Sequence, residues 1–451
     1  MCGQDDWEPW TMGKRIRKAG ENPDGCARKE GGQLTFVDAF AGCGGLSLGL
    51  MRSGWKGLFA IEKDKFAYET LQANLLSEGG RFTYQWPDWL PQVPQTVDHI
   101  LSEHAEHLIA LRGQVDLLAG GPPCQGFSSA GRRKADDARN KLVHDYLKLV
   151  EALEPSVVLI ENVRGIASSF NQDDRSDLNY AAYLQEALGK KYVVHTETLR
   201  APAYGVPQMR PRFFLIGLKR DNDIIQGGGN PFDVVRAARW SFLFENGLQR
   251  SPSSRSALSD LEVGKNGTVN CEDTLGYEAI DYHGPETSLQ RFLNDGHKGI
   301  PSDTRLAKHK QHIVQRFSEI VRICKETNRL NTTISKETKE KFGIKKQAIR
   351  VLDPENPSPT VTSMPDDLLH YSEPRTLTVR ENARLQTFPD WFAFKGKYTT
   401  GGHRRRNEVP RFTQVANAVP PVIAEIIGMA LWDITSGANA LGRRSLNKSV
   451  A

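Results

Sequence analysis

Short apolar segments alternate with stretches of helical periodicity from Leu34 to about Lys219. The apolar segments that predict strands are Leu34–Val37, Leu58–Ile61, Val115–Ala119, Val157–Ile160, Tyr192–Thr198 and Phe213–Leu218. Between the third and the fourth, apolar residues recur at helical spacing; they are Leu142, Tyr146, Leu149, Val150 and Leu153. This alternation predicts an α/β fold, with a mostly parallel sheet and helices on both of its faces.

The character of the sequence changes near Asp221, where apolar segments become shorter and polar residues more frequent. We therefore predict a polar and loosely ordered leader (residues 1–32), a first domain (33–220) and a smaller second domain (221–347). The chain then returns to the first domain (348–435) and ends in a tail (436–451). The second domain contains one clear helical pattern, formed by Ile313, Phe317, Ile320, Val321 and Cys324. A last helix begins at Pro420-Pro421, and we expect its apolar stripe to pack onto the first domain.

Composition narrows the possible classes of protein only slightly. The net charge of +5 and the pI of about 8.7 permit a polyanionic partner without requiring one. The six cysteines form no CxxC pair and no metal-ligand spacing, so we expect a reducing compartment, no disulfide scaffold and no metal site. No apolar run is long enough to span a membrane, and residues 1–32 lack the apolar core of a signal peptide.

Residues suited to binding or catalysis follow four of the predicted strands. Phe40 and a glycine turn follow the first strand, Glu62 follows the second, Cys124 the third and Glu161 the fourth. Ligands of open α/β sheets bind beyond the carboxyl ends of the strands. We therefore expect these residues to line one crevice. Glu161 follows a buried strand, and burial predicts a raised pKa for its carboxyl group.

Cys124 lies in the segment Gly120-Gly121-Pro122-Pro123-Cys124-Gln125-Gly126-Phe127-Ser128. The prolines restrict the backbone before the cysteine, and the glycines let another molecule approach closely. A thiol held in this way can act as a positioned nucleophile. The alternative is a buried structural cysteine, which would need no such frame.

This segment resembles the catalytic Pro-Cys loop of the cytosine-C5 DNA methyltransferases of the bacterial and phage restriction-modification type. Further motifs of that family follow in order, namely Phe36–Ser47 with Glu62, Glu161-Asn162-Val163, Tyr204–Arg212, Arg375–Gln386 and Gln414–Pro421. The resemblance extends from about Leu34 to Leu431 and leaves residues 221–346 unmatched. It implies a Rossmann-like methyltransferase domain, with a target recognition domain in the unmatched segment.

The resemblance also implies a site for S-adenosylmethionine. Its expected contacts are Phe40, Gly42, Gly44, Gly45, Leu46, Glu62, Asp88, Gly121, Pro123, Leu142 and Asn417. Glu62 would bind the ribose hydroxyls, and Leu142 would lie near the adenine. The third motif of the family is not legible, and Asp88 in Trp86-Pro87-Asp88-Trp89 is the nearest candidate for the adenine contact.

For catalysis, the resemblance implies that Cys124 adds to C6 of a flipped-out cytosine in duplex DNA. Glu161 would hydrogen-bond N3 and the exocyclic amine, and Arg212 would hold O2, with Arg210 beside it. The methyl group then passes to C5 without a metal. Further contacts to DNA are expected from Gln125, Ser128 and Gln208.

Two alternatives remain open, a transfer RNA cytosine-C5 methyltransferase and a catalytically silent DNA-binding regulator. The resemblance is compatible with a bacterial, cytoplasmic and nucleoid-associated monomer, and with a cognate restriction endonuclease that acts on the same site without direct contact. Basic residues that could touch phosphates are Lys308, Lys310, Arg316, Lys345, Lys346 and the run His403-Arg404-Arg405-Arg406. For each, the alternative is a solvated side chain.

Overall fold

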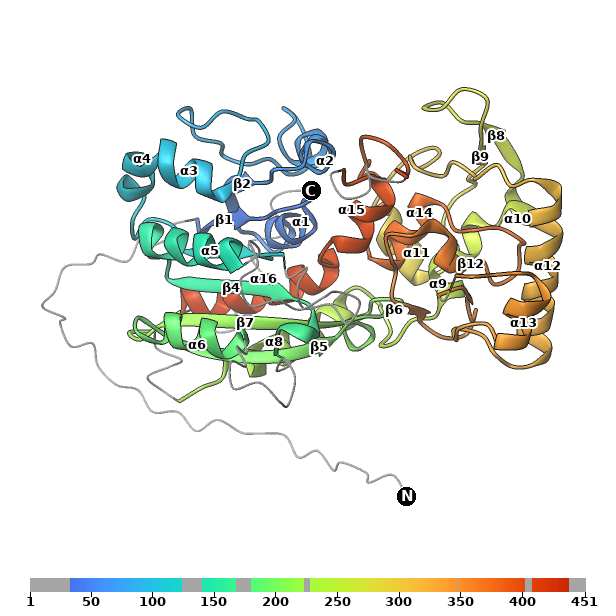
Figure 1. Cartoon of the computed structure of the whole chain (residues 1–451). Helices are drawn as coiled ribbons and strands as arrows, with labels where there is room; N and C mark the ends of the chain where they lie inside the picture. Colours follow the sequence, from blue (N-terminus) through green and yellow to red (C-terminus); the bar gives the residue numbers. More distant parts are fainter. Residues whose placement is uncertain are drawn as a thin grey trace, which may run out of the picture. The chain divides into compact units, whose positions relative to one another are not determined.

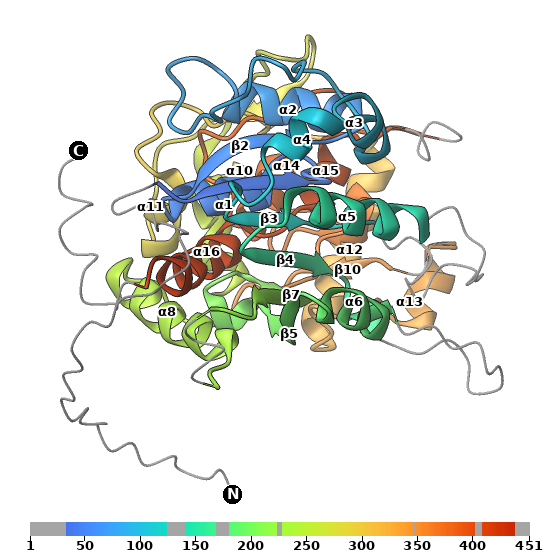
Figure 2. The same ribbon diagram turned by 90° about the vertical axis from the view of Figure 1, so that its left-hand side faces the viewer.

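The computed structural model describes residues 33–123, 140–167, 180–222, 228–346, 348–401 and 408–437. A six-stranded sheet has the strand order β2-β1-β3-β4-β7-β5 (Figure 1). The bounds in chain order are β1 Thr35–Ala39, β2 Lys56–Ile61, β3 Leu117–Gly120, β4 Val157–Asn162, β5 Tyr192–Arg200 and β7 Pro211–Lys219. Figure 2 shows these strands one below another, from β2 to β5. All run parallel except β7, so the prediction of a mostly parallel sheet is confirmed.

Strand β7 is antiparallel to both of its neighbours, β4 and β5. The chain passes from β5 to β7 through the short 3-10 helix η2 (Ala201–Tyr204) and strand β6 (Gln208–Met209), without a crossover helix. A short connection can join antiparallel strands, whereas parallel strands need a longer crossover. The reversal places the beginning of β7 beside the end of β4, where Phe213 pairs with Asn162. Two motifs far apart in the sequence therefore meet at one edge of the sheet.

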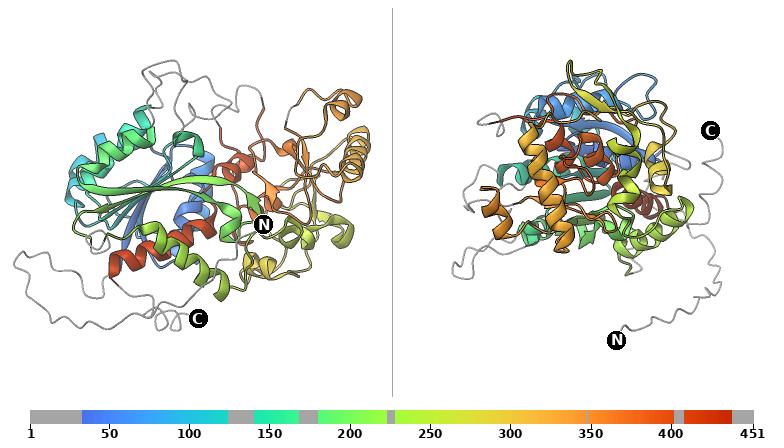
Figure 3. Two further views of the ribbon diagram at one scale, coloured as in Figure 1. Left: turned by 90° about the horizontal axis from the view of Figure 1, so that it is seen from below. Right: turned by 90° about the vertical axis from the view of Figure 1, so that its right-hand side faces the viewer.

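Helices cover both faces of the sheet (Figure 3, left). One face carries α1 (Gly45–Arg52), α2 (Lys65–Leu75), α8 (Pro231–Glu245) and α16 (Pro421–Ser436), and the other carries α3 (Val97–Glu103), α4 (Ala105–Ala110), α5 (Asn140–Leu153) and α6 (Tyr180–Gly189). The strands alternate between the two cores; in β3, for example, Leu117 and Ala119 face one core and Leu118 faces the other. This period of two is why short apolar runs predicted the strands.

Helices α1 and α16 approach each other closely through glycine. A side chain at Gly49 would place its Cβ 2.4 Å from the Cβ of Ala424. As the sequence predicts, α16 starts at the proline pair and packs onto the sheet region, with Ile423, Ile426 and Ile427 buried. Contrary to the expectation from the sequence, the helical stretch Arg411–Ser436 is long and apolar enough to cross a membrane; 72% of its apolar window is buried, as in the core helix of a folded domain.

Residues beyond α8 form short elements. They comprise α9 (Ser254–Leu258), η3 (Ser259–Leu261), α10 (Val263–Asn266), β8 (Thr268–Asn270), β9 (Glu278–Ile280), α11 (Ser288–Asn294), α12 (Gln311–Glu326), α13 (Lys336–Lys341), β10 (Arg350–Val351), β11 (Ser358–Pro359), η4 (Pro365–Asp367) and β12 (Leu368–Leu369). Some of their apolar residues, such as Phe317 and Ile320, form a small separate core, whereas others, such as Leu258 and Leu289, belong to the large core of the sheet. The predicted second-domain helix is α12, and it buries Phe317, Ile320, Val321 and Cys324. Helix α8 lies within residues 221–347, yet it packs against α16 and β5. The domain boundaries themselves stay a prediction.

Helix α14 (Val379–Leu385) is buried although it is rich in charge. Its Arg384 binds Asp260 and Asp390, and its Arg380 donates to the carbonyl oxygens of Pro389 and Phe392. These bonds connect α14 to η3 and to the segment that follows α14, so this part of the chain is held by paired charges as well as by apolar packing. The remaining described helices are η1 (Arg164–Ala167) and α15 (Arg411–Asn417).

Candidate active site

The turn after β1 has an unusual backbone. Phe40, Gly42 and Gly44 have positive φ angles of 61°, 58° and 93°. A left-handed conformation is unfavourable for phenylalanine, and the turn is held by Ala41, whose N–H donates to the carbonyl of Ile61 at 3.0 Å. A Cβ added to Gly42 would meet no atom within 4 Å. This side of the turn is therefore open to a ligand.

Glu62 follows β2 and lies directly against the same turn. Its carboxylate accepts hydrogen bonds from the N–H of Gly42 at 2.9 Å and of Asp64 at 2.7 Å. Burial raises the pKa of Glu62, and these backbone bonds offset part of that effect. An oriented carboxylate beside an open glycine turn fits the ribose end of S-adenosylmethionine, because two hydroxyl groups need acceptors there.

Two of the expected glycine-turn contacts have packing roles. The Leu46 side chain is 4% exposed and belongs to the sheet core, so a contact of Leu46 with the cofactor would come from its backbone. A Cβ at Gly45 would lie 2.5 Å from the carbonyl oxygen of Val419. Gly45 thus allows the segment before α16 to approach the turn. Asn417 ends α15 and is exposed, with no hydrogen bond to its side chain among the described residues.

The surroundings of Arg210 differ from those expected of a catalytic residue. Its side chain is 1% exposed, and its Nη2 donates to the carbonyl of Ala416 at 2.5 Å. Gln386 supports the same segment by donating to the carbonyl of Val415 at 2.8 Å. Burial lowers the pKa of Arg210. Because the guanidinium is enclosed by protein, Arg210 positions the segment that carries Asn417 and does not reach a substrate.

The expectation that Gln208 contacts DNA is corrected for the same reason, because its side chain is enclosed by protein. It is completely buried, and its amide donates to the carbonyl of Leu385 and to the side chain of Gln386. Its oxygen accepts from the N–H of Val361 at 2.9 Å. With both ends of the amide occupied inside the protein, Gln208 joins β6 to α14 and to the segment after β11 and is not available to DNA.

Glu161 and Arg212 form a buried ion pair at the edge where β4 ends and β7 begins. Arg212 Nε lies 2.9 Å from Glu161 Oε1, and the side chains are 12% and 10% exposed. Arg212 Nη1 donates to the carbonyl of Pro211, whereas Nη2 has no hydrogen bond among the residues that the structure describes. Burial raises the pKa of Glu161, while Arg212 and Arg210 act in the opposite direction. The predicted direction of this shift agrees with the structure.

The beginning of the Pro-Cys segment lies against this pair. A Cβ at Gly121 would be 3.3 Å from Glu161 Oε2 and 3.5 Å from the Glu161 carbonyl oxygen, so the backbone of Gly121 lies close to Glu161. Asn162 donates from Nδ2 to the carbonyl of Pro122 at 2.9 Å. Pro123 is half-buried. Cys124, Gln125 and Ser128 lie outside the described residues.

The expected adenine contacts are less enclosed. Asp88 is exposed, and its neighbour Trp89 packs edge-on against Phe59 and stacks on His107 of α4. The segment that contains α3 and α4 is joined to the cofactor side, because the N–H of Gln95 donates to the carbonyl of Glu62 at 2.8 Å. On α5, Leu142 is half-buried.

The buried face of α5 contains Val143 in place of Leu142, together with the other apolar residues that the helical spacing identified. Leu142 therefore lies off the core face.

Sequence reasoning missed a buried polar chain beneath the glycine turn. Ser47 donates to Asp38 Oδ2 at 2.5 Å, and the Tyr84 hydroxyl donates to Ser47 at 2.6 Å. Asp38 is completely buried, and burial raises its pKa to about 7. The available signal was a single acid inside the apolar strand Phe36-Val37-Asp38-Ala39. Asn162 was also missed as a structural partner of the Pro-Cys segment.

The basic residues predicted to touch phosphates differ in their surroundings. Lys346 is paired with Asp366 and Asp367, at 2.5 and 2.7 Å. Within the described ranges, no carboxylate pairs with the other four, which are Lys308, Lys310, Arg316 and Lys345. The run 403–406 lies outside these ranges.

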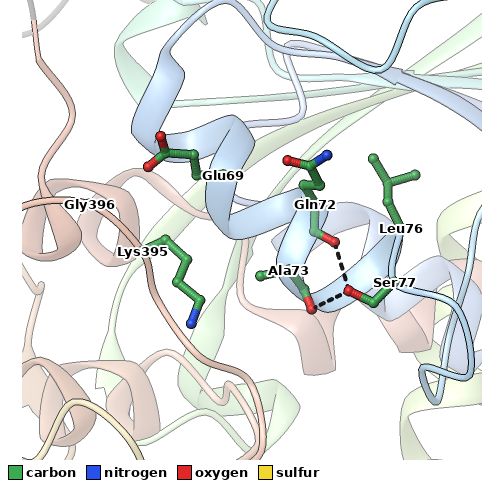
Figure 4. A pocket seen from close by; sticks show the side chains of 7 residues that line it. All are labelled: Glu69, Gln72, Ala73, Leu76, Ser77, Lys395 and Gly396. Carbon is green, nitrogen blue, oxygen red and sulfur yellow. Dashed lines mark hydrogen bonds between the residues drawn. The ribbon is translucent and has the colours of Figure 1, made fainter. Parts of the chain in front are cut away.

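One surface hollow has a volume of about 610 Å³ and lies on α2 (Figure 4). It is lined by Glu69, Gln72, Ala73, Leu76, Ser77, Lys395 and Gly396. None of the predicted site residues is among them, and Ser77, which follows α2, donates its hydroxyl to carbonyl oxygens of that helix. This hollow is therefore separate from the Glu161–Arg212 pair.

The reversed strand β7, the glycine turn after β1 and the acid after β2 together define a S-adenosylmethionine-dependent methyltransferase fold. Residues 34–432 match the family model of the C-5 cytosine-specific DNA methylases, and the chain belongs to this family. It is accordingly a DNA cytosine-5 methyltransferase that uses S-adenosylmethionine.

Relatives of known name agree with this assignment. The chain is 31% identical over 404 residues to the Type II methyltransferase M.DdeI of Desulfomicrobium norvegicum, covering 87% of each chain. It is 30% identical to the Type II methyltransferase M1.HphI of Haemophilus parahaemolyticus, covering 88% of this chain and 86% of the other. A crystal structure of a DNA modification methyltransferase encoded within an Escherichia coli prophage has a TM-score of 0.60 and 23% identity, over 90% of this chain and all of that one, which supports the fold.

Proposed function

We propose that this enzyme methylates one cytosine of a specific duplex DNA sequence, through a covalent bond between Cys124 and C6 of the base. The observation that carries the proposal is the buried Glu161–Arg212 pair, with the Pro-Cys segment held against it by Asn162. The cytosine has to leave the duplex to reach this pair, at a cost of about a few kcal/mol.

Glu161 and Arg212 act on the polar edge of the base. A carboxyl group with a raised pKa can stay protonated and donate a hydrogen bond to N3. Arg212 Nη2, which has no hydrogen bond among the described residues, can donate to O2 while Nε stays on Glu161. Both donors face the positions where negative charge develops when a nucleophile adds to the ring, so their contribution increases in the transition state.

Cys124 supplies the nucleophile. An ordinary thiol has a pKa of about 8.5, so loss of its proton is needed before attack. The sulfur forms a bond to C6, and the electrons of the C5–C6 double bond move to C5. After methylation, loss of the proton on C5 restores the double bond as the bond between sulfur and C6 breaks. The cysteine is regenerated and the product is 5-methylcytosine.

The cofactor is held by the glycine turn and its surroundings. We propose that Glu62 binds the ribose hydroxyls, that Phe40 and the N–H groups around Gly42 line the pocket, and that Asn417 closes it. Asp88 and Leu142 are the candidates on the adenine side. When bound, S-adenosylmethionine supplies the methyl group that C5 accepts. The open side of Gly42 and the oriented carboxylate of Glu62 support this placement.

Partners follow from the class of enzyme and its relatives. We propose that residues 221–347 read the DNA sequence, that the enzyme works as a monomer on bacterial DNA in the cytoplasm, and that it belongs to a restriction-modification pair. The names of the Type II relatives support the last point. Direct contact with an endonuclease is not required, because both enzymes would act on the same DNA site.

The test is transfer of a labelled methyl group from S-adenosylmethionine to unmethylated duplex DNA, with Cys124→Ala and with RNA as controls. We expect label on C5 of cytosine in DNA and none with the variant. Bisulfite mapping then locates the modified cytosine. Label on RNA alone would overturn the choice of substrate, and full turnover by Cys124→Ala would overturn the mechanism.

A further inference from the structure

Five side chains from three separate segments form an alternating stack of cations and tyrosines. The Arg411 guanidinium lies 4.1 Å from the centre of the Tyr398 ring, and the Arg305 guanidinium lies 3.5 Å from the same centre. Arg305 is also 4.3 Å from the centre of the Tyr277 ring, and Lys308 Nζ is 4.7 Å from it. Two guanidinium groups cannot share one face of a ring, so the order is Arg411, Tyr398, Arg305, Tyr277 and Lys308.

The two ends of this stack differ in charge compensation. Arg411 is bound by two carboxylates, Asp273 at 2.6 Å and Asp303 at 2.9 Å. Arg305 and Lys308 have no carboxylate partner among the residues that the structure describes, and Arg305 Nε is buried without a hydrogen-bond partner. The aromatic faces hold the Arg305 guanidinium by cation–π attraction without neutralising its charge. This end of the stack therefore presents fixed, uncompensated positive charge.

The stack is connected to the active site through a series of contacts. Arg411 is the first residue of α15, and the carbonyl of Ala416 in the same helix accepts a bond from Arg210, two residues before Arg212. The stack is thus joined to the Glu161–Arg212 pair through α15 and Arg210. Seven helical residues span about 10 Å. Backbone phosphates follow one another at about 1.7 Å of duplex axis, counting both strands.

We propose that Arg305, assisted by Lys308, binds a backbone phosphate of the DNA duplex, and that Tyr277 and Tyr398 hold the guanidinium in place for it. This inference rests on the proposed function, because it requires duplex DNA at the active site. A phosphate contact positions the duplex and carries no sequence information. Its loss weakens binding equally for target and non-target DNA.

The experiment measures DNA binding by fluorescence anisotropy across a series of salt concentrations, with the full-length enzyme and with Arg305→Gln. Losing one phosphate contact lowers the slope of log K against log salt by about 0.9. We expect this change for Arg305→Gln on both target and non-target duplexes, and retention of the slope for Arg305→Lys. The matched control is Arg322→Gln, which removes the same charge from α12, where Arg322 is paired with Glu319 and Glu326. The control should leave the slope unchanged.

Lys308→Gln is the second variant, because Lys308 is exposed and its replacement does not disturb the core. It should change the slope in the same direction. If Arg305→Gln proves unstable in thermal unfolding, Lys308→Gln serves as the test in its place. Unchanged slopes for both variants, with methyl transfer to DNA intact in the wild type, would overturn this inference alone. Absence of methyl transfer to DNA in the wild type would overturn the proposed function instead.

Discussion

Glu161 and Glu381 are both buried beside an arginine, yet their environments shift the pKa in opposite directions. Glu161, in the active site, receives a single ion-pair contact from Arg212 Nε, and burial raises its pKa. Glu381, in α14, receives two hydrogen bonds from Arg375 at 2.8 Å and one from the N–H of Thr378 at 2.7 Å, and its pKa is lowered. At Glu381 the charge and the hydrogen bonds of Arg375 outweigh desolvation, whereas at Glu161 desolvation outweighs the contact with Arg212.

The comparison separates structural charge from functional charge. A carboxyl group whose charged form is fully satisfied holds segments together, as Glu381 does for α14 and its capping box. A carboxyl group left under-compensated retains hydrogen-bonding capacity that a substrate can use. The sign of the pKa shift also states whether the folded protein prefers the charged or the neutral form. Replacing each glutamate with glutamine tests this directly.

The largest effect on stability is expected for Glu381→Gln. The variant leaves the buried Arg375 with one carboxylate partner, Glu373, and removes the charge that its bidentate bonds require. Breaking a buried pair in this way costs about 3–5 kcal/mol of unfolding free energy. Urea denaturation followed by circular dichroism measures it. Glu319→Gln is the control, because Glu319 makes comparable ion pairs on the exposed surface of α12, and we expect little change there. Equal stability of the two variants would contradict the distinction.

Glu161→Gln should have the reverse profile. The fold disfavours the charged form of Glu161, whereas the change leaves Arg212 without its carboxylate partner; these effects oppose each other, so we expect a smaller loss of stability in urea than for Glu381→Gln. The amide cannot adjust its proton as charge develops on the base, and we expect kcat to fall by about 10²–10³-fold, as for the loss of one oxyanion donor.

Steady-state methyl transfer with labelled S-adenosylmethionine measures the loss of activity of Glu161→Gln. A variant that unfolds as readily as Glu381→Gln, or one that keeps full kcat, would show that the two glutamates do not differ in the way proposed.

The same contrast explains what the sequence could predict. Strand-end residues such as Glu62 and Glu161 follow directly from short apolar runs, and the structure brings the glycine turn and Glu62 together. The burial of Arg210 depends on Ala416, 206 residues away, and that of Gln208 depends on Leu385 and Gln386. Spacing within a motif reports which residues share an edge. It does not predict which backbone carbonyl groups of a distant segment will accept hydrogen bonds from the side chains of these residues.

The direction of β7 was hidden for a related reason. An apolar strand is apolar in either direction, and only its connection to β5 fixes how it runs. The position of Leu142 on α5 was ambiguous because it and Val143 are adjacent on a helix, and only packing against the sheet selected Val143. Asp38 was overlooked because a lone acid within a strand pattern carries no sign of its partners Ser47 and Tyr84.

Asp38 gives the most specific prediction, a change in the pH dependence of stability. Its pKa is about 7 in the folded protein, whereas an unfolded aspartate has a pKa of about 3.9. The folded state therefore retains a proton that the unfolded state loses, and the stability from Asp38 is fully present below the lower value and lost as pH rises to about 7. Asp38 is surrounded by Ser47 and Tyr84, with Glu62 as the nearby charge that adds to the shift.

Asp38→Asn keeps an oxygen that can accept from Ser47 but cannot ionise. Between pH 4 and pH 7, the unfolding free energy of the wild type should fall relative to that of Asp38→Asn by at most about 1.4 kcal/mol per pH unit at the steepest point. Urea denaturation at each pH measures the difference between the two proteins, which cancels groups that both share. A constant difference would mean that Asp38 is ionised in the folded state. The glycine turn would then rest on a charged carboxylate, like the satisfied carboxylate of α14 and unlike Glu161.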